Sequence, residues 1–173
     1  MYELFILGEL LDQDLHGYLL RDIINRTIGP TRQLSWGALY PLLRKMQEDE
    51  LIEQLQEAGT TGRLRKVYRL TPKGRTRFFD LMRQPADYDS DYPDLFHIKL
   101  VNFDHLTPEE QRIILQHYQG YVRFVGEQLQ ASRHYVAGNT SIPSPEQRFV
   151  LLALDHRLQL NKADLTWIEM LLQ

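Results

Sequence analysis

The chain changes its apolar spacing part-way along, and this change restricts the folds that it can adopt. Apolar residues recur at helical intervals over residues 4–11 and 19–24, which predicts two helices of about three turns each. Two short runs then flank "GTTG" at 59–62, a pattern that predicts a β-hairpin over 51–70. Helical spacing returns after the Thr-Pro pair at 71–72, a typical helix start. The predicted fold class is therefore mainly α with a small β-hairpin.

A third helix is predicted over residues 35–49, with Ser35 as its N-cap. Its apolar stripe consists of Trp36, Leu39, Tyr40, Leu43 and Met46. The aliphatic and methionine members of this stripe are assigned to the core, whereas the two aromatic members fit the core and an exposed contact equally well. Gly37 costs about 1 kcal/mol relative to alanine inside a helix, and small residues in a first turn leave the backbone open to close approach.

Three helices, a hairpin and another helix follow the order of a winged helix-turn-helix domain, whose third helix commonly enters the DNA major groove. Basic residues gather at the hairpin of this domain: residues 62–77 hold seven Lys or Arg and no Asp or Glu, although the net charge of the chain is −3. Local positive charge gives affinity for phosphates whatever the net charge. A solvated charged hairpin is the alternative interpretation, but the coincidence with a helix-turn-helix favours nucleic acid.

The segment "RQPADYDSDYPD" at 83–94 interrupts any helical period with two prolines and four aspartates. The charge changes sign across it, from net +2 over residues 1–84 to net −5 over residues 85–173. We therefore predict a winged helix-turn-helix domain over 1–84, a linker over 85–93, and a helical domain over 94–173. An acidic run of this kind is typical of a solvated linker.

The second half of the chain is predicted to be helical. The tetrapeptides "TPEE" at 107–110 and "SPEQ" at 144–147 both read as capping boxes with proline at the first helical position. The last helix carries two apolar stripes that lie about 150° apart at 100° per residue. One stripe is Phe149, Ala153, His156, Leu160, Ala163, Trp167 and Met170, and the other is Leu151, Leu154, Leu158, Leu165, Ile168 and Leu172.

Two nearly opposite apolar faces need two neighbours. The helix that starts near residue 107 supplies one of them, and a second subunit is predicted to supply the other in a two-fold homodimer. We assign the leucine-rich stripe, Leu151 to Leu172, to the dimer interface, although the sequence does not establish which face meets the partner. Burial of both faces within one subunit is the alternative.

Composition and motifs exclude several classes of protein. The chain has no cysteine, which excludes disulfides and thiolate metal sites and suits a reducing compartment. Its six histidines lack the spacing of a zinc site, and no P-loop, GxGxxG or GxSxG is present. No apolar stretch approaches the roughly 20 residues that span a bilayer. We expect a cytoplasmic protein that is not an enzyme, with no cofactor, no metal and no membrane partner.

Three stretches of the first half resemble the PadR family of bacterial transcriptional regulators in their order and spacing: "ILGELLDQDLHGYLLRDI", "LSWGALYPLLRKMQEDELIE" and "GRLRKVYRLTPKGR". The triplet HGY at 16–18, "GALYP" at 37–41 and the pattern Y-x-L-T-x-x-G at 68–74 are similar to the motifs of that family. Trp36 and Ala38 stand where the family more often has proline and threonine, so the operator sequence does not carry over. The last helix, with "LDHRLQLNKADLTWIEML", resembles the virulence-activator-type dimerisation domain of one PadR subgroup.

The resemblance implies a sequence-specific transcriptional regulator that binds double-stranded DNA. The residues implied to contact DNA are His16, Ser35, Trp36, Ala38, Tyr40, Arg63, Arg65, Lys66 and Lys73. A simple surface role is the alternative for His16. The resemblance further implies a dimeric repressor on an inverted-repeat operator, and a small aromatic effector bound near the dimer interface. Phe149, Tyr118, Tyr121 and Trp167 are candidate walls for that effector, or else core residues.

The rival interpretation is a winged-helix module that binds protein and not DNA. A protein-binding hairpin has no need of seven uninterrupted basic residues, so we favour DNA. The operator, the target genes, the sign of regulation and the existence of an effector are left open by the sequence.

Overall fold

The computed structural model describes residues 1–29, 33–58 and 64–173. Within these ranges, the chain divides into two compact units, Met1–Leu106 and Thr107–Gln173. They are called unit 1 and unit 2 below, and each is described by itself. Arg63 and the predicted hairpin tip at 59–62 lie outside the described residues. Among the described helices, none is long and apolar enough to cross a bilayer.

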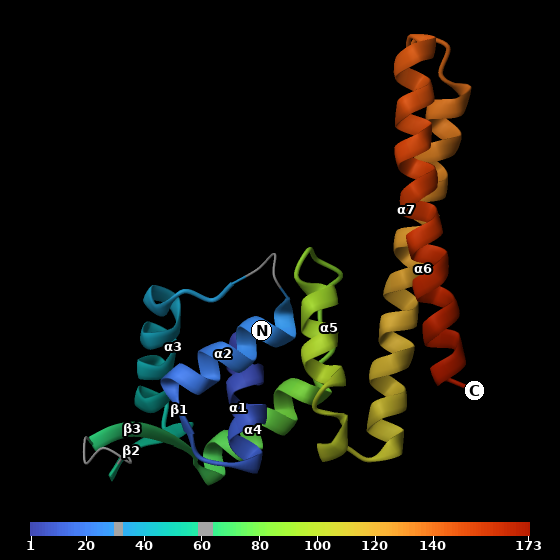
Figure 1. The fold of residues 1–173 in the computed structure, drawn as a ribbon. Helices are drawn as coiled ribbons and strands as arrows, with labels where there is room; N and C mark the ends of the chain where they lie inside the picture. Colours follow the sequence, from blue (N-terminus) through green and yellow to red (C-terminus); the bar gives the residue numbers. More distant parts are fainter. Residues whose placement is uncertain (30–32, 59–63) are drawn as a thin grey trace. The chain divides into compact units, whose positions relative to one another are not determined.

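Unit 1 contains the three predicted helices, the hairpin and the helix after it in the predicted order (Figure 1). The elements are α1 (Tyr2–Asp12), β1 (Leu15–His16), α2 (Gly17–Ile28), α3 (Trp36–Glu48), β2 (Ile52–Ala58), β3 (Leu64–Leu70), α4 (Pro72–Arg83), α5 (Tyr92–Leu100) and the short 3₁₀ helix η1 (Phe103–His105). This confirms the predicted fold class, mainly α with a small hairpin. The hairpin formed by β2 and β3 is called the wing from here on.

The wing is part of a three-stranded antiparallel sheet in the order β1-β3-β2. Strand β2 pairs with β3 from Ile52 opposite Leu70 to Ala58 opposite Leu64. The two-residue strand β1 pairs with the other edge of β3, with Leu15 opposite Tyr68. The sequence did not predict β1, because two residues carry no usable periodicity.

The core of unit 1 gathers around α1, which contacts α2, α4 and β3. The largest completely or almost completely buried side chains are Phe5, Ile6, Leu7, Leu20, Ile24, Leu39, Leu43, Met46, Phe78, Met82, Phe96 and Ile98. Burial of each such side chain is worth about 1.5–3 kcal/mol. The predicted core members of α3 are all in this set. Helices α2 and α3 are thereby fixed to the rest of the unit by their inner faces, which leaves their outer faces for another role.

The junction between the wing and α4 is fixed by backbone contacts. Thr71 caps α4 as predicted, because its hydroxyl accepts a hydrogen bond from Gly74 N at 3.0 Å. The same hydroxyl lies within hydrogen-bond distance of two carbonyl oxygens, Glu50 O at 2.7 Å and Leu51 O at 3.0 Å. A Cβ atom at Gly74 would overlap Leu51 O, so only glycine permits this close approach.

Unit 1 extends beyond the predicted boundary at residue 84. Helix α5 packs against α2, and Phe96 and Ile98 of α5 are buried in the unit. The side chain of Lys99 is 7% exposed, and its Nζ donates to Gln84 O at 2.7 Å. Residues 94–106, which we had predicted to be part of the C-terminal domain, therefore belong to the first compact unit. The functional division into a DNA-binding and a dimerisation domain stays a prediction.

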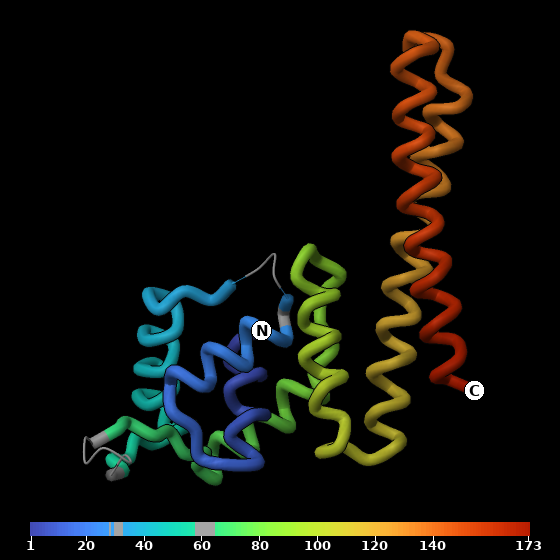
Figure 2. The backbone as a smooth tube through the Cα atoms, in the orientation of Figure 1, coloured from blue at the N-terminus to red at the C-terminus, as the bar shows by residue number. Residues whose placement is uncertain are grey.

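Unit 2 is an antiparallel hairpin of two long helices, α6 (Pro108–Gly138) and α7 (Ser144–Leu171), which run side by side (Figure 2). The capping box at 107–110 is confirmed: Thr107 Oγ1 accepts from Glu110 N at 3.3 Å, and Glu110 Oε2 accepts from Thr107 N at 2.9 Å. The one predicted at 144–147 is wrong, because Pro143 is the N-cap of α7. The Gln147 side chain instead donates across the turn to Val136 O at 2.8 Å.

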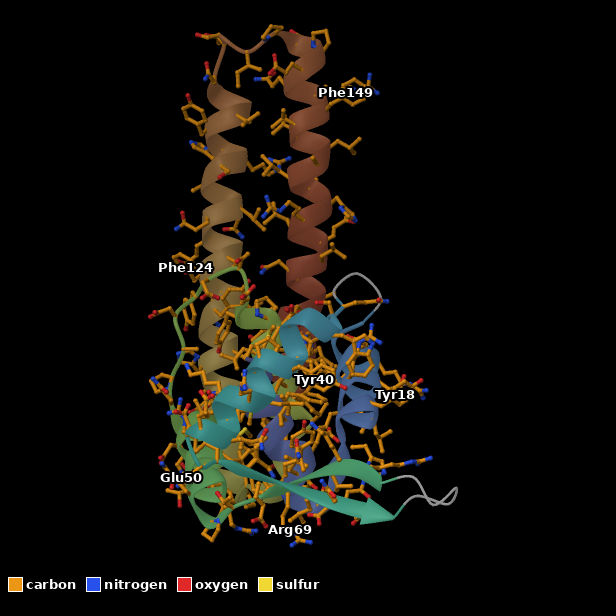
Figure 3. All side chains as sticks on the ribbon, turned by 90° about the vertical axis from the view of Figure 1, so that its left-hand side faces the viewer. Tyr18, Tyr40, Glu50, Arg69, Phe124 and Phe149 are labelled. Atoms are coloured by element: carbon orange, nitrogen blue, oxygen red, sulfur yellow. The ribbon has the colours of Figure 1, made fainter. Side chains whose placement is uncertain are left out.

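The two apolar stripes of α7 occupy different environments. Asn161 lies on the same side of the helix as the leucine-rich stripe, and its amide donates to Val122 O of α6 at 2.8 Å. On this side Ile168 is completely buried within the chain, and the other members of the stripe are half-buried. On the opposite side Phe149 and Leu160 are 64% and 59% exposed, and Phe149 points away from α6 (Figure 3). This corrects our division of the stripes, because the side assigned to a second subunit faces α6.

Candidate nucleic-acid interface

The start of α3 is tied to α2 by side chains that the sequence analysis did not single out. Asn25 Oδ1 accepts a hydrogen bond from Leu34 N at 2.7 Å, and Arg21 Nε donates to Leu34 O at 2.9 Å. Leu34 itself is buried. Both polar groups of its backbone therefore have side-chain partners on α2, which fixes where the first turn of α3 begins.

The first turn of α3 is open to solvent. Ser35 is its N-cap as predicted, but the hydroxyl makes no capping hydrogen bond. Ser35, Gly37 and Ala38 are exposed, and a Cβ atom at Gly37 would meet no atom closer than 3.8 Å. Small side chains therefore leave the positive end of the helix accessible, an arrangement that suits an anion.

Three aromatic side chains stack along this surface. The Trp36 ring lies 6.0 Å from Tyr18 and 5.5 Å from Tyr40 between centroids, with interplanar angles of 28° and 20°. The guanidinium carbon of Arg21 lies 4.7 Å from the Trp36 centroid. Tyr18 and Tyr40 are 71% and 52% exposed, and Trp36 is half-buried. We call Tyr18, Trp36 and Tyr40 the aromatic column. Tyr40 therefore lies outside the core, which answers the question that the sequence left open for it.

A pocket of about 480 Å³ lies next to the column, where α2, α3 and β3 meet. It is lined by His16, Gly17, Tyr18, Leu19, Tyr40, Arg65, Lys66 and Tyr68. His16 is the N-cap of α2, and its Nδ1 atom is buried without a hydrogen-bond partner among the described residues. Burial, followed by the proximity of Tyr40, raises the pKa of Tyr68, so its hydroxyl stays protonated. We call this the basic pocket. Two cations, tyrosine hydroxyls and a helix N-terminus can together bind a phosphate oxygen.

A second hollow, of about 570 Å³, continues the surface along the other side of Tyr40. Its lining includes Arg44 and Lys45 of α3, together with Gln54 and Lys66 of the wing. Arg44 forms a long ion pair with Glu48, at 3.8 Å, and both side chains are largely exposed. These two α3 cations were missing from the predicted site. The sequence did carry a signal for them, because Arg44 and Lys45 lie one helical turn after Tyr40 and Pro41.

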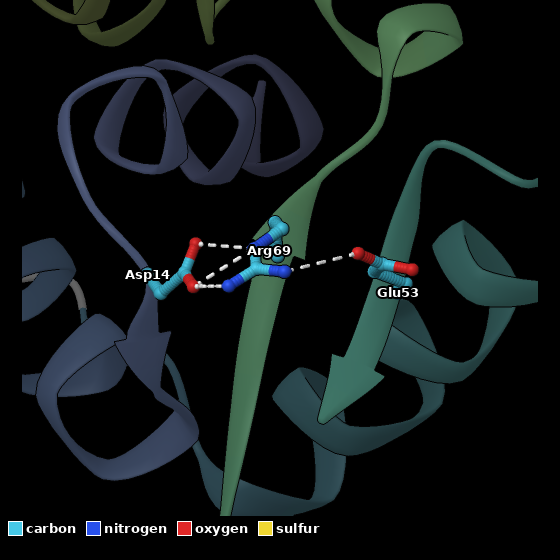
Figure 4. Close-up of polar contacts among 3 residues, drawn as sticks. All are labelled: Asp14, Glu53 and Arg69. Atoms are coloured by element: carbon cyan, nitrogen blue, oxygen red, sulfur yellow. Dashed lines mark hydrogen bonds and ion pairs between the residues drawn. The ribbon is translucent and has the colours of Figure 1, made fainter. Parts of the chain in front are cut away.

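Three other cations of the basic stretch, Arg69, Lys73 and Arg77, have protein partners. Arg69 donates to Asp14 through Nε at 2.9 Å and Nη2 at 2.6 Å, and its Nη1 lies 3.7 Å from Glu53 Oε1 (Figure 4). The pKa of Arg69 is raised, mainly by its hydrogen bond with Asp14 and next by the negative charge of Asp14. Arg77 pairs with Glu3 at 2.7 Å and Lys73 with Glu50 at 3.3 Å. By contrast, Arg65 and Lys66 are exposed and form no ion pair with any described residue.

The structure thus brings only some of the predicted DNA-binding residues together. His16, Tyr40, Arg65 and Lys66 line one pocket, with Trp36 stacked on Tyr40. Lys73, which pairs with Glu50, does not line this pocket. In Figure 3, Glu50 lies toward the opposite end of the wing from Tyr18. The position of Arg63 lies outside the described residues.

A separate polar cluster lies at the end of α1. His105 Nε2 is 3.7 Å from Asp12 Oδ1 and 3.7 Å from Asp104 Oδ1. The three ligand-type atoms lie within 4.8 Å of one another. A histidine nitrogen between two carboxylates is a common surface arrangement, and it does not test our prediction that the chain has no metal site.

Comparison with known proteins bears directly on this surface. Residues 6–80, which carry α1 to most of α4, match the model of the transcriptional regulator PadR-like family. The solved structure of a PadR-like transcriptional regulator from Bacillus cereus is 36% identical, with 45% of this chain and 74% of that chain covered and a TM-score of 0.41. The chain belongs to the PadR-like family of transcriptional regulators. That class is one of regulators, not of enzymes.

Two further relatives describe the range of the similarity. A transcriptional regulator of Mycobacterium tuberculosis is 38% identical over 72 residues, which are 42% of this chain and 64% of that protein. The match thus spans less than two thirds of that relative. The Bacillus subtilis PadR structure with operator DNA is 21% identical, covers 98% of this chain and 95% of that chain, and has a TM-score of 0.47. The structure of the same protein with p-coumaric acid is also 21% identical, covers 98% of this chain and 92% of that chain, and has a TM-score of 0.43.

The PadR motifs can now be divided by what their residues do. In the stretch 68–74, Thr71 and Gly74 fix the approach of α4 to the wing. In the triplet 16–18, His16 and Tyr18 line the basic pocket. Trp36 is the central ring of the aromatic column.

Proposed function

We propose that this PadR-like regulator binds double-stranded DNA with the first turn of α3 in the major groove and with the basic pocket on a phosphate. The observation that carries this proposal is the placement of three features on one surface: the open first turn, the aromatic column, and the exposed cations Arg65 and Lys66, which have no ion-pair partner in the part of the chain that the structure describes. Winged helix-turn-helix proteins dock in this way. The site residues stay predictions, and Arg63 is one of them.

The basic surface needs no excess of positive charge on the whole chain. Phosphate neutralisation releases counterions locally, and each contact contributes about 0.9 to the salt slope of binding. The paired cations Arg69 and Arg77 should bind a phosphate more weakly, because the phosphate would compete with their carboxylate partners. Arg44 and Lys45 of α3 extend the phosphate-binding surface beyond the wing.

A substitution in the first turn of α3 separates DNA binding from folding. Ala38 is the third residue of α3, and a glutamate there is the partner that an N-cap serine uses in a capping box. Ala38→Glu should therefore leave the helix as stable as before, or more stable. The same carboxylate would face phosphates and repel them. We expect at least a hundredfold loss of affinity for a fluorescent duplex taken from upstream of the gene, measured by anisotropy.

Ala131→Glu is the matched control, because Ala131 is also exposed and helical but lies in α6. It adds the same charge and should leave affinity within about twofold. Equal losses in the two variants would mean that net charge and not the α3 surface governs binding. If the unmodified chain binds no duplex in dilute salt, the DNA-binding proposal fails and the protein-binding module takes its place.

We further propose that the protein is a homodimer that acts as a repressor on an inverted repeat. Two recognition helices about 34 Å apart would meet successive major grooves on one face of the duplex. We now assign the interface to the exposed stripe of α7, which includes Phe149, Leu160 and Met170, together with the neighbouring exposed Leu152. A cytoplasmic location is part of the proposal, because the bacterial chromosome is there.

The dimer is tested by light scattering of the purified chain. Leu160→Glu should produce monomers at micromolar concentration, because it places a charge in the exposed stripe. Arg157→Glu, on the same helix but outside both stripes, is the control and should remain dimeric. A dimer that survives Leu160→Glu would contradict the assigned face.

A small aromatic effector completes the proposal and rests on the family resemblance. Of the four predicted walls, Tyr118 is buried and its hydroxyl donates to Asp164 at 2.7 Å, whereas Phe149 is open to solvent. The compound p-coumaric acid, which Bacillus subtilis PadR binds, is a suitable first probe. Addition of this acid should weaken the binding of the upstream duplex, and unchanged binding would remove it from the proposal.

A further inference from the structure

The aromatic column is too exposed to be explained by the core of unit 1 alone. The other apolar members of the α3 stripe, Leu39, Leu43 and Met46, are buried to 1% exposure or less. Tyr18 and Tyr40 flank Trp36 with 71% and 52% of their surface open to solvent. Stacked aromatic pairs add roughly 0.5–1.5 kcal/mol beyond burial, which orders the rings but leaves apolar surface in water.

The position of the column relates it to the start of α3. Trp36 is the first residue of α3, and Tyr40 lies one turn further on. Arg21 holds the Trp36 ring from α2 and also donates to Leu34 O, so the ring and the helix start are fixed together. Tyr18 and Tyr40 also line the basic pocket, so a phosphate held by Arg65 and Lys66 would place the duplex directly beside the column.

The chemistry of the major groove indicates what such a surface can recognise. Ring carbon atoms neither donate nor accept conventional hydrogen bonds, so they cannot read the donor and acceptor pattern of guanine, cytosine or adenine. The apolar group that the major groove presents is the C5-methyl of thymine. Contact with an aromatic ring removes that methyl group from water.

We infer that the aromatic column is a thymine-selecting element of this regulator, and that Trp36 is its central specificity-determining residue. The inference rests on the proposed DNA-binding function and adds the base that is read and the group that is recognised.

The test replaces thymine by deoxyuridine, which removes one methyl group and leaves base pairing intact. Duplexes are first selected from a random library with the full chain, and each thymine of the selected site is then replaced in turn. For the unmodified protein, replacement at one or two positions per half-site should weaken binding about three- to tenfold, the effect of one methyl group returned to water. Replacement elsewhere should change affinity by less than about twofold.

Variants assign the effect to the column. Trp36→Ala should bind the thymine and deoxyuridine duplexes with equal affinity, because the contact is lost in both. Tyr88→Ala is the control: Tyr88 is an exposed aromatic residue of unit 1 outside the column, and this variant should keep the full deoxyuridine penalty. If Trp36→Ala does not fold, Tyr40→Ala serves in its place, since the Tyr40 ring is half exposed.

The outcomes separate this inference from the proposed function. Binding with no deoxyuridine penalty at any thymine, or selected sites without a fixed thymine, would overturn thymine selection while DNA binding stands. A penalty that persists unchanged in Trp36→Ala and Tyr40→Ala would assign the methyl contact to other residues and overturn the role of the column. Absence of any duplex binding would instead remove the proposed function itself.

Discussion

The cations of unit 1 fall into two groups that differ in what faces them. Arg65 and Lys66, at the outer part of β3, are exposed and unpaired within the described residues. Arg69, at the inner part of the same strand, is held by two carboxylates, and Lys99 is buried against a backbone carbonyl. Side chains of the same chemical type therefore serve a surface in one region and the fold in the other.

The short strand β1 accounts for much of this difference. Leu15 pairs with Tyr68 in an antiparallel register, which brings the preceding residue, Asp14, beside Arg69. The pairing ends at Val67, and the chain then turns into α2 at Gly17. Arg65 and Lys66 lie beyond the end of β1 and so receive no carboxylate from it. The division of the basic stretch thus follows from two residues of strand pairing.

The largest effect on stability is expected at Gly74, where the basic stretch joins the wing to α4. Gly74→Ala would drive a methyl group into Leu51 O, and overpacking against backbone should cost about 3 kcal/mol of unfolding free energy. Urea unfolding checks this value. Gly37→Ala is the matched control, because its added Cβ meets no atom closer than 3.8 Å and alanine should stabilise the helix by up to about 1 kcal/mol. Equal stability of the two variants would contradict the described junction.

The buried lysine should produce a pH dependence of stability. Burial lowers the pKa of Lys99 from 10.5 to about 8. Between pH 8 and 10.5 the unfolded chain binds this proton and the folded chain does not, so the free energy of unfolding should rise with pH by an amount on the order of 3 kcal/mol. Below pH 8 both states bind the proton and this contribution is constant.

Lys99→Met tests this dependence. At pH 7 it should raise the unfolding free energy by about 2 kcal/mol. The variant gains stability because a charged amine no longer has to be buried, and it loses part of that gain with the hydrogen bond to Gln84 O. The rise with pH should also shrink, as measured by urea unfolding at pH 7 and pH 10. Lys162→Met, at an exposed position of α7, should change neither quantity. A variant that is less stable at pH 7 would show that the amine is well satisfied where it lies.

A crossed pair of arginine variants sharpens the comparison within β3. Arg69→Ala removes the ion pair with Asp14 and should lower the unfolding free energy by less than Gly74→Ala does, while the salt slope of DNA binding stays the same. Arg65→Ala should do the reverse, with unchanged stability and a slope lower by up to about 0.9. The reverse pattern of results would exchange the roles of the two arginines.

The smallest effect is expected at Lys73, which was predicted from the sequence as a DNA contact. Its pair with Glu50 is exposed, so Lys73→Ala should change stability by no more than about 0.5 kcal/mol. The basic pocket does not include Lys73, so the salt slope should also stay the same. A slope lower by about 0.9 would restore Lys73 to the interface.

Local signals in the sequence were sufficient for most elements of the fold. The helical stripes of α1, α2 and α3, the turn signal of the wing, and the caps at Thr71 and Thr107 each depend on neighbouring residues. The capping box at 144–147 failed because Gln147 found acceptors across the turn, a tertiary contact that no local pattern encodes. The first compact unit extends past residue 84 for the same kind of reason, since α5 is held by packing on α2.

The candidate site was less predictable than the fold. The sequence located the basic stretch and α3, but it could not say which cations would be neutralised, because Asp14 and Arg69 are 55 positions apart and meet only through β1. The stacking of Tyr18 on Trp36 likewise joins two helices. Arg21 and Asn25, which fix the start of α3, have no signature apart from their helical spacing.

The salt dependence of DNA affinity tests the central claim most directly. The double variant Arg65→Ala/Lys66→Ala and the control Arg112→Ala/Arg157→Ala, which removes two exposed cations of unit 2, are compared with the unmodified chain on one duplex between 50 and 200 mM salt. We predict a slope lower by up to about 1.8 for the wing variant and an unchanged slope for the control. Equal slopes in all three proteins would contradict the claim that the basic pocket binds phosphate.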